Sequence, residues 1–233
     1  MKNFLNLDNL QRFAVTYNHT NYKLNKTITT KDANGRILSN WINNTRPTLK
    51  DIRITDMSGT ITNCYRLFNN ARNLISIDLT NFNTNNVTTM SNMFYSCSNL
   101  TGNISNFNTS KVTDMQRMFY DCSNLTGNIP NFNTGNVIRM SSMFYYCLNL
   151  TGGNFNFTTV SKVIDMSNMF YGCNNLNQNA LNSIYNMCIN ATSVSRKNLS
   201  NSSPYSPLYG TKFNNSYIPS SFKTRLTAAG WTY

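Results

Sequence analysis

The stretch MQRMFYDCSNL, at Met115–Leu125, decides how this chain folds, because close copies of it recur at a nearly constant interval. The pattern M-x-x-M-F-Y-x-C-x-N-L occurs four times, and its cysteines lie 25, 25 and 26 residues apart. Repetition at such a period predicts units that stack on one another. The four copies begin at Met90, Met115, Met140 and Met166, a degenerate copy spans Cys64–Leu74, and a shortened copy spans Leu181–Cys188.

Each block is predicted to form a short helix with one buried face. On a helix of about 3.6 residues per turn, the apolar side chains of the first block fall within an arc of about 120°. Between blocks, alternating Ile77 and Leu79 predict a short strand, and N-F-N-T segments favour turns. One unit cannot bury both halves alone, so about five strand-turn-helix turns are expected to stack into a solenoid. The arc contains Met90, Met93, Phe94, Cys97 and Leu100.

Three regions follow from the extent of the repeat. Residues 1–51 lack it and are predicted to be an N-terminal attachment or oligomerisation segment, in which Leu7, Leu10 and Phe13 share one face of a helix. In the same segment, Asn34-Gly35 predicts a hairpin turn. Residues 52–188 form the predicted solenoid, which begins near Ile52-Arg53-Ile54.

Residues 189–233 are predicted to be a C-terminal cap. Prolines punctuate a loop rich in Ser and Asn, and a short helix is expected over Pro219–Ala229. Phe222 and Leu226 lie on one face of that helix, and Gly230 would end it. Trp231 is then expected to seal the open end of the core.

Charge is sparse and concentrated at the ends. Only 12% of residues are charged, every acidic residue is Asp, and the net charge is +12. Residues 1–73 carry 11 Lys/Arg against 4 Asp, residues 74–176 carry 4 against 4, and residues 177–233 carry 5 against none. A groove for nucleic acid would need a basic stripe along the repeats, so nucleic acid is not an expected partner. No stretch approaches the roughly 18 apolar residues of a membrane span, and no apolar run typical of a signal peptide follows Lys2.

The residues do not suggest an enzyme. Four of the six cysteines fall at one helical phase, which predicts a ladder of buried thiols rather than a metal site. His19 is the single histidine, no CxxC occurs, and no P-loop, GxSxG, HExxH or GxGxxG is present. Asp114 and Asp165 are expected to cap helix N-termini. We therefore predict a protein without catalytic residues, metal or cofactor.

A tyrosine follows the buried phenylalanine in each of the four full blocks. On the predicted helix it points about 150° away from the centre of the apolar arc. An exposed aromatic row would suit a protein partner or a glycan, whereas the alternative is that these tyrosines only shield neighbouring helices. The row consists of Tyr95, Tyr120, Tyr145 and Tyr171; on the opposite face, Asn103, Ser105, Asn128 and Asn154 are polar candidates.

The repeat unit, which reads NFNTSKVTDMQRMFYDCSNLTGNI, resembles the bacterial surface protein (BspA-type) branch of the leucine-rich repeats. The resemblance extends over about Ile52–Cys188. It implies a right-handed α/β solenoid of the kind found in surface-exposed adhesins, and it implies no catalytic residues.

The opening FLNLDNLQRF, at Phe4–Phe13, resembles the beginnings of bacteriophage tail and head-fibre proteins, where a short LDLDGLxxF helix starts the chain. It departs from that pattern at Asn9, where Gly is common, and no long coiled coil follows. The resemblance implies a virion component whose leader attaches to the particle.

Three functions are compatible with these observations. The first is an oligomeric virion protein, assembled in the host cytoplasm with other virion proteins, that displays its solenoid towards a host-surface glycan or protein. The second is a bacterial cell-surface adhesin. The third is an intracellular scaffold that binds another protein. Because fold does not determine function, the choice depends on the site.

Overall fold

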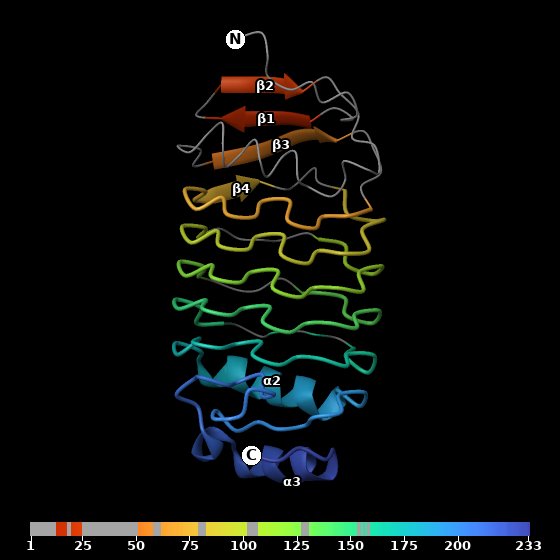
Figure 1. Ribbon diagram of the computed structural model, residues 1–233, viewed down its shortest axis with the longest axis vertical. Coiled ribbons are helices and arrows are strands. Elements are labelled where there is room, and N and C mark those ends of the chain that lie inside the picture. Colours follow the sequence, from red (N-terminus) through yellow and green to blue (C-terminus); the bar gives the residue numbers. More distant parts are fainter. Residues whose placement is uncertain are drawn as a thin grey trace.

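The computed structural model describes the backbone of three strands near the N-terminus and most of the chain from residue 62 onwards. Each repeat forms one turn of the backbone, called a coil below. The coils are stacked along the long axis of the molecule, with a sheet at one end and helices at the other (Figure 1). The described ranges are 13–17, 20–24, 51–57, 62–78, 83–101, 107–126, 131–152, 155, 157 and 159–233.

The sheet has four strands in the order β2-β1-β3-β4. Strand β1 pairs antiparallel with β2 and β3, and β3 pairs parallel with β4 through partners such as Ile52↔Ile77. The strands expected at Ile52–Ile54 and at Ile77 are therefore confirmed, and Leu79 lies outside the described residues. The bounds are β1 Phe13–Tyr17, β2 Thr20–Leu24, β3 Asp51–Met57 and β4 Ser76–Asp78.

Successive repeats are joined by backbone hydrogen bonds between residues about 25 positions apart. A chain of parallel bridges runs from coil to coil through Asn63, Thr89, Asp114, Arg139 and Asp165. Within each block, every second N–H donates to a carbonyl of the following coil. In the first full block these bonds are Met90 N to Asp114 O at 2.9 Å, Asn92 N to Gln116 O at 2.9 Å, Phe94 N to Met118 O at 2.8 Å and Ser96 N to Tyr120 O at 2.7 Å.

The prediction of a helix was wrong for the four full blocks and for the degenerate copy at Cys64–Leu74, whereas the shortened copy at Leu181–Cys188 is helical and lies within the helix Gln178–Asn190. Other N–H groups, which do not reach the next coil, instead close four-residue turns, such as Met93 N to Met90 O at 3.1 Å and Tyr95 N to Asn92 O at 3.1 Å. In this block Asn92 and Ser96 have left-handed backbone angles, with φ of 56° and 55°. A left-handed residue at every fourth position interrupts a right-handed helix, and the neighbouring coil supplies the acceptors that a helix would find four residues back.

The apolar stripe predicted for the interior is confirmed. All five residues of the arc that begins at Met90 are 0% exposed. The phenylalanines of adjacent coils stack almost parallel, with ring centroids 5.3 Å apart for Phe94–Phe119 and 5.4 Å apart for Phe119–Phe144. The 25-residue interval thus places like side chains on top of one another, so every coil covers the core of the next.

The cysteines of the full repeats form the predicted ladder of buried, free thiols. Each Sγ donates to the carbonyl of a phenylalanine in the preceding coil, and burial raises the pKa of these thiols, as it does for Cys122. The thiols are therefore protonated packing groups. The pairs are Cys97–Phe68, Cys122–Phe94, Cys147–Phe119 and Cys173–Phe144, at 3.0 to 3.1 Å.

Helices occur only after the last full coil, within the described residues. Helix α2 spans Gln178–Asn190, the short η2 spans Asn215–Tyr217, and α3 spans Ser220–Ala228. The helix expected over Pro219–Ala229 is confirmed, with Leu226 fully buried and Gly230 at φ +83° just after its end. Trp231 is also buried as predicted, and its Nε1 donates to Cys188 O at 2.7 Å.

The C-terminal region also closes the hydrogen-bonding edge of the stack. Asn168 N donates to Ser206 O at 2.9 Å, and Phe170 N donates to Pro207 O at 2.8 Å. In the preceding coils these positions bond to the next repeat. The segment around Ser206 and Pro207 therefore takes the place of a further coil as the acceptor for these two N–H groups.

Candidate functional site

The structure brings the four predicted tyrosines together in one continuous stack. The ring centroids are 4.7 Å apart for Tyr95–Tyr120, and 4.4 Å apart for both Tyr120–Tyr145 and Tyr145–Tyr171, with interplanar angles of 7° or less. Tyr209 extends the stack from the C-terminal segment, 5.3 Å from Tyr171 and tilted by 56°. We call Tyr95, Tyr120, Tyr145 and Tyr171 the tyrosine row.

The tyrosine row is half-buried rather than fully exposed. Rings stacked 4.4 Å apart cover each other's faces, so the inner members can offer a partner mainly their edges and hydroxyl groups. Desolvation and the neighbouring hydroxyls of Tyr120 and Tyr171 raise the pKa of Tyr145 to about 12. Its hydroxyl therefore remains protonated at neutral pH and can donate a hydrogen bond.

Tyr146 widens the row at its C-terminal end. It is 41% exposed and stands edge-on to Tyr145 at 4.8 Å and to Tyr171 at 5.2 Å. The equivalent positions hold Ser96 and Asp121, so this aromatic is a departure from the repeat. Gly172 lies against it: a Cβ there would come within 2.6 Å of the Tyr146 ring. The absence of a side chain at Gly172 makes room for Tyr146.

Many polar side chains on the coils are occupied by bonds along the stack. Asn124 Nδ2 donates to Asn99 Oδ1 and Asn149 Nδ2 donates to Asn124 Oδ1, both at 3.2 Å. Lys111 Nζ donates to Asn86 Oδ1 at 2.6 Å. These amides act mainly as links between coils. The other polar candidates, Asn103, Ser105, Asn128 and Asn154, lie outside the described residues.

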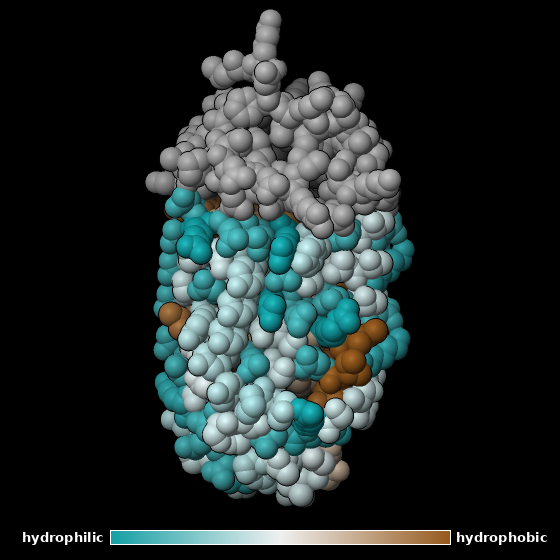
Figure 2. Space-filling view, in the orientation of Figure 1, coloured by the Kyte–Doolittle hydropathy of each residue, from teal (hydrophilic) through white to brown (hydrophobic). Residues whose placement is uncertain are grey.

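An apolar patch stands out on a face that is otherwise hydrophilic or neutral (Figure 2). Ile138 and Ile164 are the exposed isoleucines of two adjacent coils, 39% and 52% exposed, and Ile164 N donates to Ile138 O at 3.0 Å. Threonines occupy the corresponding positions of earlier coils, where the Thr113 hydroxyl donates to Thr88 O. At this position of the repeat, the exposed side chain therefore changes from threonine to isoleucine towards the C-terminal end of the stack.

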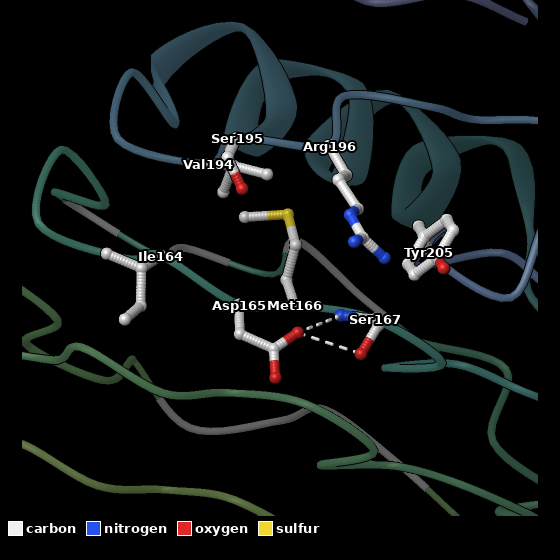
Figure 3. Close-up of a pocket in the computed structure, with 8 residues that line it drawn as sticks. All are labelled: Ile164, Asp165, Met166, Ser167, Val194, Ser195, Arg196 and Tyr205. Carbon is white, nitrogen blue, oxygen red and sulfur yellow. Dashed lines mark hydrogen bonds between the residues drawn. The ribbon is translucent and has the colours of Figure 1, made fainter.

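A pocket of about 410 Å³ lies where the last full coil meets the C-terminal segment (Figure 3). The Arg196 guanidinium lies over the Tyr205 ring, 4.1 Å from its centroid. Below them, one carboxylate oxygen of Asp165 accepts hydrogen bonds from Ser167 N at 3.0 Å and Ser167 Oγ at 2.8 Å. The lining residues are Ile164, Asp165, Met166, Ser167, Val194, Ser195, Arg196 and Tyr205.

No motif in the sequence predicts this pocket. Arg196 and Tyr205 lie in a segment rich in Ser and Asn, and the position of Asp165 predicts a cap for a helix. No helix follows Asp165 or Asp114; each carboxylate instead accepts the N–H two residues later, as for Gln116 N to Asp114 Oδ1 at 2.9 Å. The local acceptor role agrees with the prediction, whereas the predicted helix is absent. The one sequence signal was the excess of cations after residue 177.

Of the three predicted attachment residues, the structure describes only Phe13. Leu7 and Leu10 lie outside the described residues, as does the expected turn at Asn34-Gly35. Phe13 lies in strand β1, so the helix predicted to include it is wrong at that position. The segment FAVTY is rich in aromatic and β-branched residues, which favour a strand when partners are present on both sides.

Two further observations concern the described part of the chain only. No group of three or more His, Cys, Asp or Glu side chains within it could hold a metal ion. None of its helices is both long enough and apolar enough to cross a membrane.

Stacked coils, a buried thiol ladder and a stacked aromatic row define a repeat protein whose units depend on one another. The family described as "Mycoplasma protein of unknown function, DUF285" matches residues 62–184, which is more than half of the chain. The protein belongs to this family. No curated protein and no solved structure matches the chain.

Proposed function

We propose that this protein is a non-enzymatic binding and assembly protein, and that the tyrosine row is the surface through which it contacts a protein partner. The observation that carries the proposal is the unbroken stack of partly exposed tyrosines, spaced 4.4 to 4.7 Å apart. Tyrosine is enriched at protein interfaces because it buries a large area at a small entropic cost.

The ring orientation favours a protein over a glycan at this row. A sugar stacks on the face of an aromatic ring, and the faces of Tyr120 and Tyr145 are covered on both sides. The exposed edges and hydroxyls are suited to the side chains and backbone carbonyls of a neighbouring subunit. The chemistry of the described residues agrees with a binding role, since the six cysteines, which are the strongest nucleophiles among them, are buried and protonated.

We further propose that the stack is a right-handed solenoid of leucine-rich-repeat type displayed on a bacteriophage particle, with residues 1–51 as its attachment segment. The resemblance of Phe4–Phe13 to fibre-protein openings supports this placement. The alternative is a bacterial cell-surface adhesin. The family description, which names a bacterium, and the resemblance of the repeat to BspA-type proteins favour that alternative.

Mass spectrometry of purified particles and of washed host cells separates the two locations. The virion proposal expects peptides of this chain in the particles, in a constant ratio to the capsid protein. Peptides found only with the washed cells would overturn it and support the adhesin.

The row itself is tested with a single charge. Tyr145→Lys places an ammonium group in the middle of the row, and Tyr233→Lys makes the same change at an exposed tyrosine of the C-terminal end. Self-association measured by sedimentation, and retention on particles or cells, should fall at least tenfold for Tyr145→Lys and stay unchanged for Tyr233→Lys. Unchanged association of a folded Tyr145→Lys protein would refute the role of the row. If that variant does not fold, Tyr120→Phe together with Tyr145→Phe keeps the stacking and tests the hydroxyls.

A further inference from the structure

We infer that the pocket between the last full coil and the C-terminal segment binds the carboxylate of an acidic sugar. This site is separate from the tyrosine row and does not depend on it. The pocket offers a cationic end formed by Arg196 and Tyr205, a polar middle that includes Asp165, and an apolar end at Ile164 (Figure 3).

Arg196 is the anchor of the site. Its guanidinium carbon lies 4.1 Å from the centre of the Tyr205 ring, a cation–π contact that does not use the N–H groups. Within the described part of the chain it makes no ion pair, whereas Arg139 is paired with Asp114 at 3.0 Å. A guanidinium whose N–H groups pair with no carboxylate of the described residues can bind both oxygens of a ligand carboxylate.

The polar middle of the pocket fits the hydroxyl groups of a sugar ring. One oxygen of Asp165 is already engaged by Ser167, which fixes the direction of the carboxylate and leaves its second oxygen to accept a hydroxyl. The exposed Ser195 hydroxyl lies on the C-terminal side of the same pocket. Because Asp165 would repel a second carboxylate, the anionic group of the ligand must lie at the Arg196 end.

Charge and shape complete the description of the ligand. Residues 177–233 carry five cationic residues and no acidic residue, so this end of the protein attracts anions. The attraction is limited to short range because salt screens it. Ile164 and Val194 line the pocket and suit a methyl group, such as that of an acetamido substituent. A volume of about 410 Å³ accommodates one sugar residue at the end of a chain.

The free carboxyl end of a peptide shares the carboxylate chemistry and is the competing source. A peptide would bring one carboxylate and a few N–H donors, whereas the sugar brings several hydroxyls to a pocket that offers both a carboxylate and serine hydroxyls. The sugar can therefore form hydrogen bonds with more of the residues that line the pocket than the peptide can. The experiment tests both ligands.

Binding is measured by NMR titration of the full chain. The probes are 3′-sialyllactose, methyl glucuronide, neutral lactose, and a short peptide with either a free or an amidated carboxyl end. We expect millimolar binding of at least one of the two acidic sugars and none of lactose. Arg196→Ala should weaken that binding at least tenfold, and Arg196→Lys should weaken it several-fold because the bidentate geometry is lost.

The matched control is Arg225→Ala. Arg225 also lies over an aromatic ring, 5.6 Å from the centre of Phe222, but outside the pocket, and its removal changes the net charge equally. It should leave sugar binding within twofold of the unchanged protein. The inference is wrong if neither acidic sugar binds, if Arg225→Ala weakens binding as much as Arg196→Ala does, or if the free-ended peptide binds more tightly than the sugars. Tyr145→Lys should bind the sugar normally, so failure of the pocket and failure of the row are distinguishable.

Discussion

The repeat blocks and the C-terminal region carry the same apolar spacing but adopt different backbones. In the block that begins at Met90, residues at intervals of three and four are buried, and the backbone forms turns bonded to the next coil. In α2, Ala180, Ile184 and Cys188 are buried at similar intervals, and the backbone is an α-helix. The spacing therefore reveals which side chains face inwards, and the available hydrogen-bond partners decide the backbone.

The largest expected difference between the two regions lies in their phenylalanines. Phe119 is 1% exposed and stacked between the rings of Phe94 and Phe144, whereas Phe222 is only partly buried against the core. Phe119→Ala should reduce the free energy of unfolding by about 3–5 kcal/mol, because it leaves a cavity within the stack. Phe222→Ala should cost about 1–2 kcal/mol, since less area is lost.

Urea denaturation of both variants, compared with the unchanged protein, provides the measurement. Equal losses for the two substitutions would mean that the stack is no better packed than the cap.

The second expected difference between the stack and the C-terminal region is the cost of removing a threonine hydroxyl. Thr134 is 0% exposed; its Oγ1 donates to Thr159 O at 2.7 Å and accepts from Thr159 N at 3.3 Å. Thr134→Val keeps the shape and leaves both groups of Thr159 without this partner, so it should cost about 1–3 kcal/mol. The same change at the exposed Thr224 of α3 should stay within about 0.5 kcal/mol. Thermal unfolding of the pair measures both, and a neutral Thr134→Val would show that the coils are not linked through this threonine.

The tyrosine row should make the free energy of unfolding decrease at high pH. The pKa of Tyr145 is raised to about 12 from an ordinary value of about 10. Tyr145 therefore holds its proton more tightly in the folded protein than in the unfolded protein. The stabilisation that results is complete below about pH 10 and is lost as the pH rises towards 12. The free energy of unfolding should fall across this window, and Tyr145→Phe should remove part of the fall. An identical pH dependence in the variant would contradict the raised pKa.

The sequence was sufficient to identify the interior of the stack and the closing role of the C-terminal region. A side chain that recurs every 25 residues must meet its own copy in the next coil, which is why the burial of Phe94, Cys97 and their equivalents could be predicted. The cap helix and the burial of Trp231 followed from local signals, namely Pro219 and Gly230.

The backbone of the blocks could not be predicted, because its acceptors lie on a neighbouring coil and not within the segment. Nothing in a single block shows that Arg117 or Tyr146 takes a left-handed conformation, since neither residue type favours it. The pocket could not be predicted from the sequence for a related reason. Asp165 and Arg196 are 31 positions apart and meet only because the C-terminal segment stacks on the last coil.

The central claim, that the blocks are turns bonded between coils while α2 is a helix, is tested most directly by exchanging alanine and glycine at one exposed position in each. Arg117 has φ of 54° in a block, and Asn186 lies in the middle of α2. At position 117, Gly should be more stable than Ala by about 1 kcal/mol, because a Cβ disfavours the left-handed conformation. At position 186, Ala should be more stable than Gly by about 1 kcal/mol, as in any helix interior. Urea denaturation of the four variants should show this reversal of sign, and a preference for Ala at both positions would contradict the account.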